Sequence, residues 1–373
     1  MRSVVLVAVL SSMFLAGQSV AVPAQTPVSA VQLLAWLAGG LTPAELRYEL
    51  QHRGVSFAAD DAYLQSLGDA GADASVVEIV KAAHPADTSA ATPAETSRVL
   101  ELLAKAAREA HIKKCEAAKQ HISSALRTTP NDANLHFALA FMLGQREQWG
   151  DAADELVQAI RLDPDFPYAH GLLAYVDYRL NDTTGAESEA RIMISTRPED
   201  PVGYKDLGLA LDAKNDFTGA LSAYNHALVL QPEYADAYYD IGVLMSRRQQ
   251  WGQAIEAYGK SLELDPNRWK GFYNLGIAYS HSGHSAEAIE AYQKAKRLAP
   301  EELTIRQNLG AEYCNHGQHE QAIIEFNELL QIDPDWNMAR LCLYKSLMAV
   351  GRVQEASHVQ QEYRTREGYS DPR

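Results

Sequence analysis

The chain carries a helical pattern of apolar residues that returns at a fixed interval. In residues 269–302, Phe272, Leu275 and Tyr279 lie at the 3.6-residue spacing of one helix face, and Tyr292 belongs to a second face of the same kind. Polar residues fill most positions between them. The pattern therefore predicts two amphipathic helices in this stretch.

The interval is 34 residues, and proline marks it most clearly. Seven prolines follow one another at this distance: Pro130, Pro164, Pro198, Pro232, Pro266, Pro300 and Pro334. An alanine lies 12 positions before each of them: Ala118, Ala152, Ala186, Ala220, Ala254, Ala288 and Ala322. Taking each proline as position 32 defines the units 99–132, 133–166, 167–200, 201–234, 235–268, 269–302 and 303–336, with 337–370 as an eighth. Such a period is typical of a solenoid, because each unit buries its apolar face only by stacking on its neighbours.

Details inside the units fit closely packed helix pairs. Position 8 is glycine in several units, as at Gly242, and position 20 is alanine, so the two helices of a pair are expected to approach closely. A turn between them is expected around Gly283, with Gly317 and Gly351 at the same place one and two periods later. The proline ends the second helix because it has no amide proton.

These residues resemble the tetratricopeptide repeat family, whose pattern places Leu-Gly, Tyr, Ala and Pro at set positions. The match is clear in the fourth unit, which carries Tyr204, Leu207, Gly208, Ala220, Tyr224, Ala227 and Pro232. The resemblance covers roughly 99–370, and it implies an all-α, right-handed superhelical solenoid of antiparallel helix pairs. The end units depart from the pattern, with Lys105 and Ala106 in place of Leu-Gly and Tyr344 in place of the glycine, and we interpret them as caps.

Two non-repeating segments precede the array, which we place at residues 97–370. Residues 30–84 predict a small bundle of four short helices, in which Thr42 and Asp73 cap two helix N-termini and Asp60 or Asp61 caps a third. Residues 85–96 are rich in Ala, Thr, Ser and Pro and are predicted to be a linker.

Residues 1–24 have the pattern of a secretory signal peptide. Arg2 precedes a largely apolar run that ends at Ala16, and small residues at Ala21 and Ala24 offer cleavage sites. The run is shorter than the ~20 residues that a membrane span needs. We expect cleavage and an exported chain, periplasmic or secreted, with no stable membrane insertion; an uncleaved anchor helix is the alternative.

The amino-acid composition limits the classes of partner and of activity that the chain could have. The chain has 33 basic and 48 acidic residues, a net charge of −15, which argues against binding nucleic acid. We interpret the excess of acidic residues as a means of keeping the protein soluble, in preference to an acidic surface that binds a basic partner. Cys115, Cys314 and Cys342 are too few and too scattered for a disulfide framework. No phosphate-binding loop, nucleophile elbow or zinc-protease motif occurs, so we expect no enzyme activity and no cofactor.

One cluster of residues suggests a metal site as an alternative. His281 and His284 lie in one predicted turn, and His316 and His319 lie in the next, with Cys314 beside them. Imidazole and thiolate suit zinc or copper. Polar turn residues without this role are the commoner case, and metal handling is kept only as an alternative function.

Function is expected on the inner face of the first helices, which lines a concave groove in the family that the chain resembles. Position 6 reads Asp206, Asp240, Asn274 and Asn308 in successive units. Asparagine ladders in that family hold the backbone of an extended peptide, because an amide both donates and accepts. An ionised aspartate only accepts. The alternative is that position 6 merely requires a small polar residue.

Aromatic and basic residues at neighbouring positions complete the predicted site: Tyr175, Tyr178, Arg179, Lys205, Tyr239, Arg247, Lys270 and Tyr273, together with Phe137 and Phe141. Rings supply contact area and basic groups meet a carboxylate. We therefore predict a non-catalytic scaffold that binds a protein or peptide segment in the groove. A repeat subunit that positions substrate for a separate transferase or envelope-assembly enzyme is the second alternative.

Overall fold

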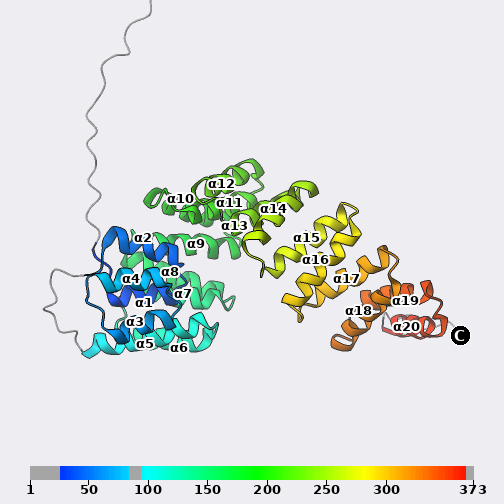
Figure 1. The fold of residues 1–373 in the computed structure, drawn as a ribbon, viewed down its shortest axis with the longest axis horizontal. Coiled ribbons are helices and arrows are strands. Elements are labelled where there is room, and N and C mark those ends of the chain that lie inside the picture. Colours follow the sequence, from blue (N-terminus) through cyan, green and yellow to red (C-terminus); the bar gives the residue numbers. More distant parts are fainter. Residues whose placement is uncertain (1–25, 84–93, 367–373) are drawn as a thin grey trace, which may run out of the picture. The chain divides into compact units, whose positions relative to one another are not determined.

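The structure, a computed structural model, describes residues 26–83 and 94–366, which form helices joined by short turns (Figure 1). These ranges contain twenty helices, and β-pairing within them is limited to one parallel bridge between Val28 and Val55. The predicted all-α class is confirmed. The helices divide into two compact units, one ending at Leu162 and the other beginning at Asp163.

The first unit holds eight helices: α1 (Ala30–Ala38), α2 (Pro43–Arg53), α3 (Asp61–Asp69), α4 (Ala74–Ala82), α5 (Ala94–His111), α6 (Cys115–Thr128), α7 (Ala133–Gly144) and α8 (Trp149–Leu162). The predicted caps are present. Thr42 forms a capping box with Glu45, and Asp60 and Asp73 accept hydrogen bonds from the backbone of α3 and α4. Because α5 begins at Ala94, the last three residues of the predicted linker are helical. The rest of that linker and the predicted signal peptide lie outside the described residues.

Helix α1 packs against α5 and α7. Trp36 is only 1 % exposed, and its Nε1 donates to Asn134 Oδ1 at 2.8 Å. The chain after α1 approaches α7 so closely that a Cβ atom on Gly39 would overlap the ring of Phe137, and one on Gly40 would overlap that of Phe141. The inner face of α7 is therefore covered by the N-terminal bundle, which is why Phe137 and Phe141 do not line an open groove.

The second unit holds six helix pairs: α9 (Pro167–Arg179) with α10 (Thr183–Thr196), α11 (Pro201–Ala213) with α12 (Phe217–Leu230), α13 (Ala235–Arg247) with α14 (Trp251–Leu264), α15 (Trp269–His281) with α16 (Ser285–Leu298), α17 (Leu303–Asn315) with α18 (His319–Ile332), and α19 (Asn337–Ala349) with α20 (Val353–Arg366). Each first helix begins 34 residues after the previous one, as Pro201 and Ala235 illustrate. The sequence period is thus the period of the helix pairs.

The turn inside each pair has a left-handed residue at the same place. Three of these are the predicted glycines Gly283, Gly317 and Gly351, with φ of 77°, 77° and 81°. In five earlier pairs, which include α5 with α6 and α7 with α8 of the first unit, the place is taken by non-glycine residues with φ from 57° to 64°: Lys113, Glu147, Asn181, Asn215 and Gln249. The same turn is therefore kept where glycine is missing, at the steric cost that a Cβ atom brings to this conformation.

Helices within a pair meet where position 8 is glycine. A Cβ atom on Gly242 would lie 2.5 Å from the ring of Tyr258, and one on Gly208 would meet the ring of Tyr224 in the same way. Ala254, at position 20, is fully buried beside the first of these contacts. The expectation that small residues allow close approach is confirmed, because an aromatic ring of the second helix fills the space over each of these glycines.

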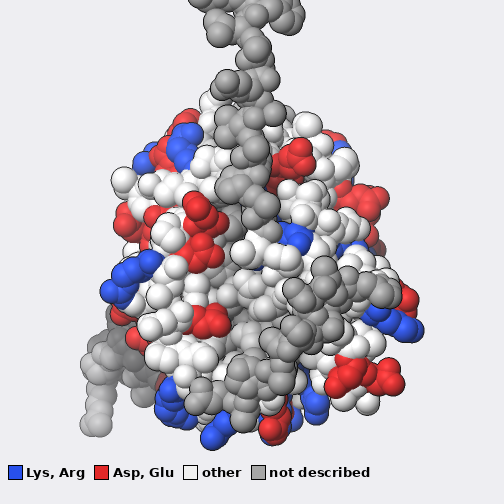
Figure 2. Space-filling model, turned by 90° about the vertical axis from the view of Figure 1, so that its left-hand side faces the viewer, with Lys and Arg blue, Asp and Glu red and all other residues white. Residues whose placement is uncertain are grey.

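The surface carries both charges. Figure 2 shows acidic and basic side chains interspersed over the face that it displays, with no broad area of one sign among the described residues there. Within residues 26–83 and 94–366, no helix combines the length and apolar character that crossing a bilayer requires.

Candidate functional site

The first helices of the second unit pack in a row, α9 on α11, α11 on α13, and α13 on α15. We call the surface that carries position 6 of these helices the inner face; its rungs are Asp206, Asp240, Asn274 and Asn308. Helical spacing puts positions 2, 5, 9, 12 and 13 on the same side as position 6. The four predicted rungs therefore belong to four successive helices, α11, α13, α15 and α17.

The two asparagine rungs bind tyrosines of the preceding repeat. Asn274 Nδ2 donates to the Tyr239 hydroxyl at 3.0 Å, and Asn308 Nδ2 donates to the Tyr273 hydroxyl at 3.0 Å. Each of these bonds uses one of the two amide protons of the asparagine, and each tyrosine hydroxyl keeps its own proton as a donor. The asparagines thus hold the phenol rings in place, a role that the sequence analysis did not assign to them.

The two aspartate rungs differ from each other. Asp206 is 3 % exposed, and its Oδ1 lies 2.8 Å from Lys205 Nζ. Asp240 is partly exposed, and burial raises its pKa to about 7 although the charge of Lys205 opposes the shift. Burial lowers the pKa of Lys205, but the negative charges around it, that of Asp206 first, together outweigh burial and raise the net pKa. Lys205 is therefore a cation paired within the protein.

The other basic residues of the predicted site are also engaged internally. Arg247 pairs with Asp212 at 2.5 Å. Arg179 Nη1 donates to the Tyr175 hydroxyl at 3.1 Å, and Lys270 Nζ lies 5.6 Å from the centre of the Trp269 ring. Each of these basic groups thus has an acidic or aromatic neighbour within the protein, and their contact with a carboxylate of a partner stays a prediction. The remaining ring, Tyr178, lies beside Tyr175, with ring centres 6.4 Å apart.

The two asparagine–tyrosine bonds and the Asp212–Arg247 ion pair share a sequence signal, a spacing of 35 residues. It separates Tyr239 from Asn274, Tyr273 from Asn308, and Asp212 from Arg247. An offset of one period plus one residue joins position 5 to position 6, or position 12 to position 13, of the next repeat. Asp212 was not among the predicted site residues, because the prediction rests on identical positions in successive repeats.

The structure does not bring the proposed metal ligands together. The His281 ring stacks on Trp251 with ring centres 4.4 Å apart, and Cys314 Sγ lies 2.9 Å from Ser346 Oγ. Across residues 26–83 and 94–366, no group of three or more His, Cys, Asp or Glu side chains is placed to hold a metal ion. Among the described residues the turns with His284, His316 and His319 therefore do not form the metal centre considered as an alternative, and the three cysteines are free thiols.

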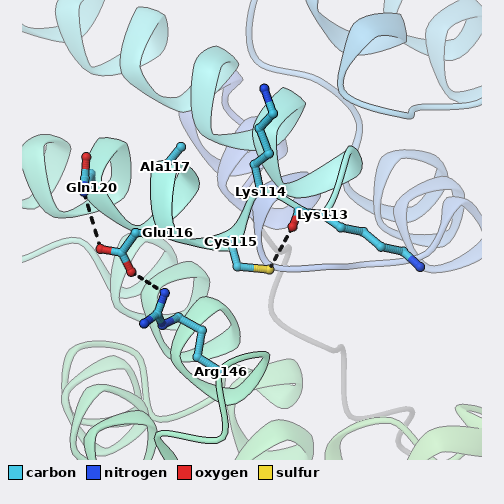
Figure 3. Close-up of a pocket in the computed structure, with 7 residues that line it drawn as sticks. All are labelled: Lys113, Lys114, Cys115, Glu116, Ala117, Gln120 and Arg146. Atoms are coloured by element: carbon cyan, nitrogen blue, oxygen red, sulfur yellow. Dashed lines mark hydrogen bonds and ion pairs between the residues drawn. The ribbon is translucent and has the colours of Figure 1, made fainter. Parts of the chain in front are cut away.

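A shallow depression in the first unit surrounds the start of α6 (Figure 3). It is lined by Lys113, Lys114, Cys115, Glu116, Ala117, Gln120 and Arg146. Glu116 pairs with Arg146 at 2.5 Å and accepts from Gln120 Nε2 at 3.4 Å. The Glu116 carboxylate in this depression is thus paired with a residue that follows α7, and this pairing favours a structural role for the depression.

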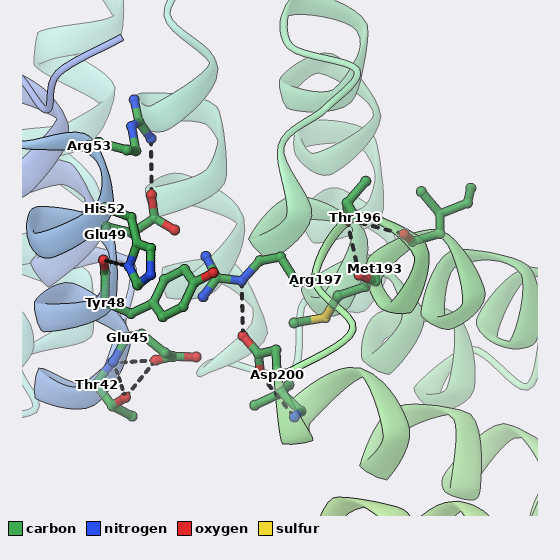
Figure 4. A network of polar contacts seen from close by, with 12 residues as sticks. Thr42, Glu45, Tyr48, Glu49, His52, Arg53, Met193, Thr196, Arg197 and Asp200 are labelled. Atoms are coloured by element: carbon green, nitrogen blue, oxygen red, sulfur yellow. Dashed lines mark hydrogen bonds and ion pairs between the residues drawn. The ribbon is translucent and has the colours of Figure 1, made fainter. Parts of the chain in front are cut away.

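Polar contacts at the end of α10 are structural as well (Figure 4). Arg197 Nε lies 3.3 Å from Asp200 Oδ2, and the Arg197 guanidinium lies 4.9 Å from the centre of the Tyr168 ring. Asp200 also caps α11 by accepting from the Val202 amide at 3.0 Å. These contacts fix the turn between two repeats.

The sequence matches four tetratricopeptide-repeat families. One, described as TPR repeat, covers residues 208–247, and three described as tetratricopeptide repeat cover 138–201, 235–268 and 269–302. The fold and these matches define a helical repeat protein. The chain contains tetratricopeptide repeats. No protein with a curated description matches the sequence significantly.

Several solved structures align with parts of this chain. The APC/C hetero-tetramer Cut9–Hcn1 aligns with 85 % of this chain and 68 % of its own at 16 % identity and a TM-score of 0.55. A thermophilic TPR protein of Thermus thermophilus aligns with 49 % of this chain and 99 % of its own, at 21 % identity and a TM-score of 0.45. PilF of Pseudomonas aeruginosa aligns with 56 % and 95 %, at 18 % identity and a TM-score of 0.48. At 16 % identity the likeness to Cut9–Hcn1 concerns the fold alone.

Proposed function

We propose that the chain is a non-catalytic scaffold whose inner face binds an extended segment of a protein or peptide, and that it acts outside the cytoplasm. Tetratricopeptide repeats serve as protein-interaction modules, and the repeats of this chain belong to that class. The export part of the proposal rests on residues 1–24 of the sequence.

The observation that carries the proposal is the pair of asparagine–tyrosine rungs. Asn274 and Asn308 are one repeat apart, and each fixes a phenol ring of the preceding helix on the inner face. Rings that are already ordered lose little entropy when a ligand covers them, so they favour binding. Tyrosine adds a hydroxyl donor for the backbone carbonyls of an extended segment.

The first unit offers an internal example of such binding. There α1 packs on α5 and α7, and the Trp36 indole donates to Asn134, which is at position 2 of its repeat. An aromatic anchor with one hydrogen bond to a first-helix amide is thus accommodated by this type of surface. The same chemistry on α13, α15 and α17 supports a partner segment as the occupant.

The test uses a displayed library of random dodecapeptides selected on the protein without its signal peptide. Selected peptides are then measured against a variant that combines Asn274→Ala, Asn308→Ala and Tyr273→Ala. Two neutral hydrogen bonds at roughly 0.5–1.5 kcal/mol each and an aromatic anchor at about 2 kcal/mol give a loss of at least about 100-fold in Kd.

Gln354→Lys on α20 is the matched control, because Gln354 is exposed and lies on a second helix. It is expected to leave the affinity unchanged. The proposal fails if the library yields no binding peptide, or if the triple variant binds selected peptides as tightly as the control while its circular dichroism is unaltered.

A further inference from the structure

Charged residues are unevenly distributed along the inner face of the second unit. At positions 2, 5, 6, 9, 12 and 13, the helices α15, α17 and α19 carry two lysines, Lys270 and Lys345, and no arginine, aspartate or glutamate. The same positions of α11 and α13 carry six charged residues: Lys205, Asp206, Asp212, Asp236, Asp240 and Arg247. We call these six positions of α15, α17 and α19 the neutral surface.

Hydrogen bonds join the three helices of the neutral surface. Asn308 of α17 donates to the Tyr273 hydroxyl of α15 at 3.0 Å. Cys314 Sγ, also on α17, lies 2.9 Å from Ser346 Oγ of α19. The neutral surface is therefore continuous from α15 to α19, and a single segment of a partner could cover all three helices.

Apolar side chains of the neutral surface are accessible. Met338 is 54 % exposed and Met348 is 44 % exposed, and Ile277 and Leu341 are partly exposed. Glu312, which accepts a hydrogen bond from the inner-face serine of α15 at 2.6 Å, is only 3 % exposed, so its charge is largely covered. Accessible apolar groups favour an apolar ligand, and methionine side chains adapt to its shape.

The first unit shows what covers an uncharged surface of this type. At the same six positions α7 carries no charged residue. Three of these positions, Asn134, Phe137 and Phe141, contact Trp36 or the two glycines that follow α1. Helix α1 is uncharged as well, and its Trp36 is 1 % exposed. An uncharged apolar segment is thus the occupant that such a surface already accommodates in this chain.

We propose that the neutral surface takes an apolar segment of the partner that contains no arginine or lysine. The inference rests on the proposed function, of which it specifies the partner. Covering the apolar side chains is favourable, whereas a basic residue would lose water without gaining an acidic partner. Lys270 and Lys345 also repel a basic segment, since like charges brought together disfavour a wrong partner.

The same peptide library tests the composition of the segment, and two pairs of variants test the surface. Ala311 lies at position 9 of α17, where α19 carries Lys345, so Ala311→Lys is expected to fold. Ala311→Met adds a side chain of similar length without the charge. Val229→Lys and Val229→Met are the matched controls, because Val229 is 77 % exposed and lies on α12, a second helix.

Peptides selected on the wild type are expected to contain fewer arginines and lysines than the unselected library. Ala311→Lys should bind them at least about tenfold more weakly than Ala311→Met, which corresponds to about 1.4 kcal/mol, because an apolar segment would desolvate the new ammonium group. The two variants at residue 229 should bind with equal affinity.

Three results overturn the inference while the proposed function stands: selected peptides whose content of basic residues equals or exceeds that of the library, equal affinities of Ala311→Lys and Ala311→Met, or the same loss with lysine at residue 229. A library that yields no binding peptide overturns the proposed function, and the inference with it.

Discussion

The contact between Gly242 and Tyr258 predicts opposite effects for two glycine substitutions in one repeat. Gly242→Ala places a Cβ atom 2.5 Å from two atoms of the Tyr258 ring, about 1 Å inside ordinary van der Waals contact. The ring has little freedom to move, because Tyr258 is 1 % exposed and its hydroxyl lies 3.2 Å from Ser246 Oγ. Overpacking of this kind costs about 1–3 kcal/mol.

Alanine also has a higher helix propensity than glycine, by roughly 1 kcal/mol, which offsets part of the loss. With the ring held in place, we expect Gly242→Ala to lower the free energy of unfolding by up to about 2 kcal/mol. Gly259→Ala is the matched control, since Gly259 lies inside α14 and a Cβ atom there meets no atom of the described residues within 4 Å. It should raise stability by about 0.5–1 kcal/mol.

The assay is urea denaturation of the full chain followed by far-UV circular dichroism, with the transition midpoints compared. Opposite shifts of the two midpoints are expected. If both substitutions stabilise the protein, the contact between Gly242 and the Tyr258 ring is refuted. If both destabilise it, the argument from helix propensity at Gly259 is refuted.

Three further predictions concern His170, the first unit and the N-terminus. Burial lowers the pKa of His170, but its bonds to Glu189 and to a backbone carbonyl outweigh burial and raise this pKa above 6.5. The charged imidazole therefore stabilises the fold fully below pH 6.5, and this contribution is lost as the pH rises through the folded pKa. His170→Gln should therefore cost more at about pH 5.5 than at about pH 9 in urea melts, and an equal cost at both would contradict the charged state. Trp36→Phe, which removes the bond to Asn134 and leaves a void, should cost roughly 1–3 kcal/mol in the same assay, and a neutral effect would show that α1 does not rest on α7. N-terminal sequencing of the protein from fractionated cells should find a mature chain beginning at Val22 or Gln25 outside the cytoplasm, and an intact Met1 in the cytoplasmic fraction would refute export.

The helix pairs could be predicted from the sequence because their determinants are local and repeated. Alanine at position 20, glycine at position 8 and the closing proline act within one unit, so each unit repeats the same information. The turns were predicted only where glycine occurs, as at Gly283. Gln249 adopts the same left-handed backbone because the helices on both sides fix it, and nothing in its own identity indicates this.

The candidate site was predicted less completely, because its contacts run between repeats. The rungs were identified by period, but the partners of Asn274 and Asn308 lie 35 residues earlier and depend on the stacking of neighbouring helices. The basic residues were predicted to contact a carboxylate of the partner, and their contacts within the protein could not be inferred from the sequence. The cover of α7 by α1 also depends on tertiary packing, since Trp36 and Asn134 are 98 residues apart.

The most direct test of the account is photo-cross-linking with a selected peptide that carries one benzoylphenylalanine. Cross-linked residues are identified by mass spectrometry after digestion. The account predicts cross-links on α13, α15 and α17, near Tyr239 and Tyr273, that are lost in the triple variant. Cross-links confined to α1–α4 would contradict it, because the partner would then bind the N-terminal bundle and not the repeats.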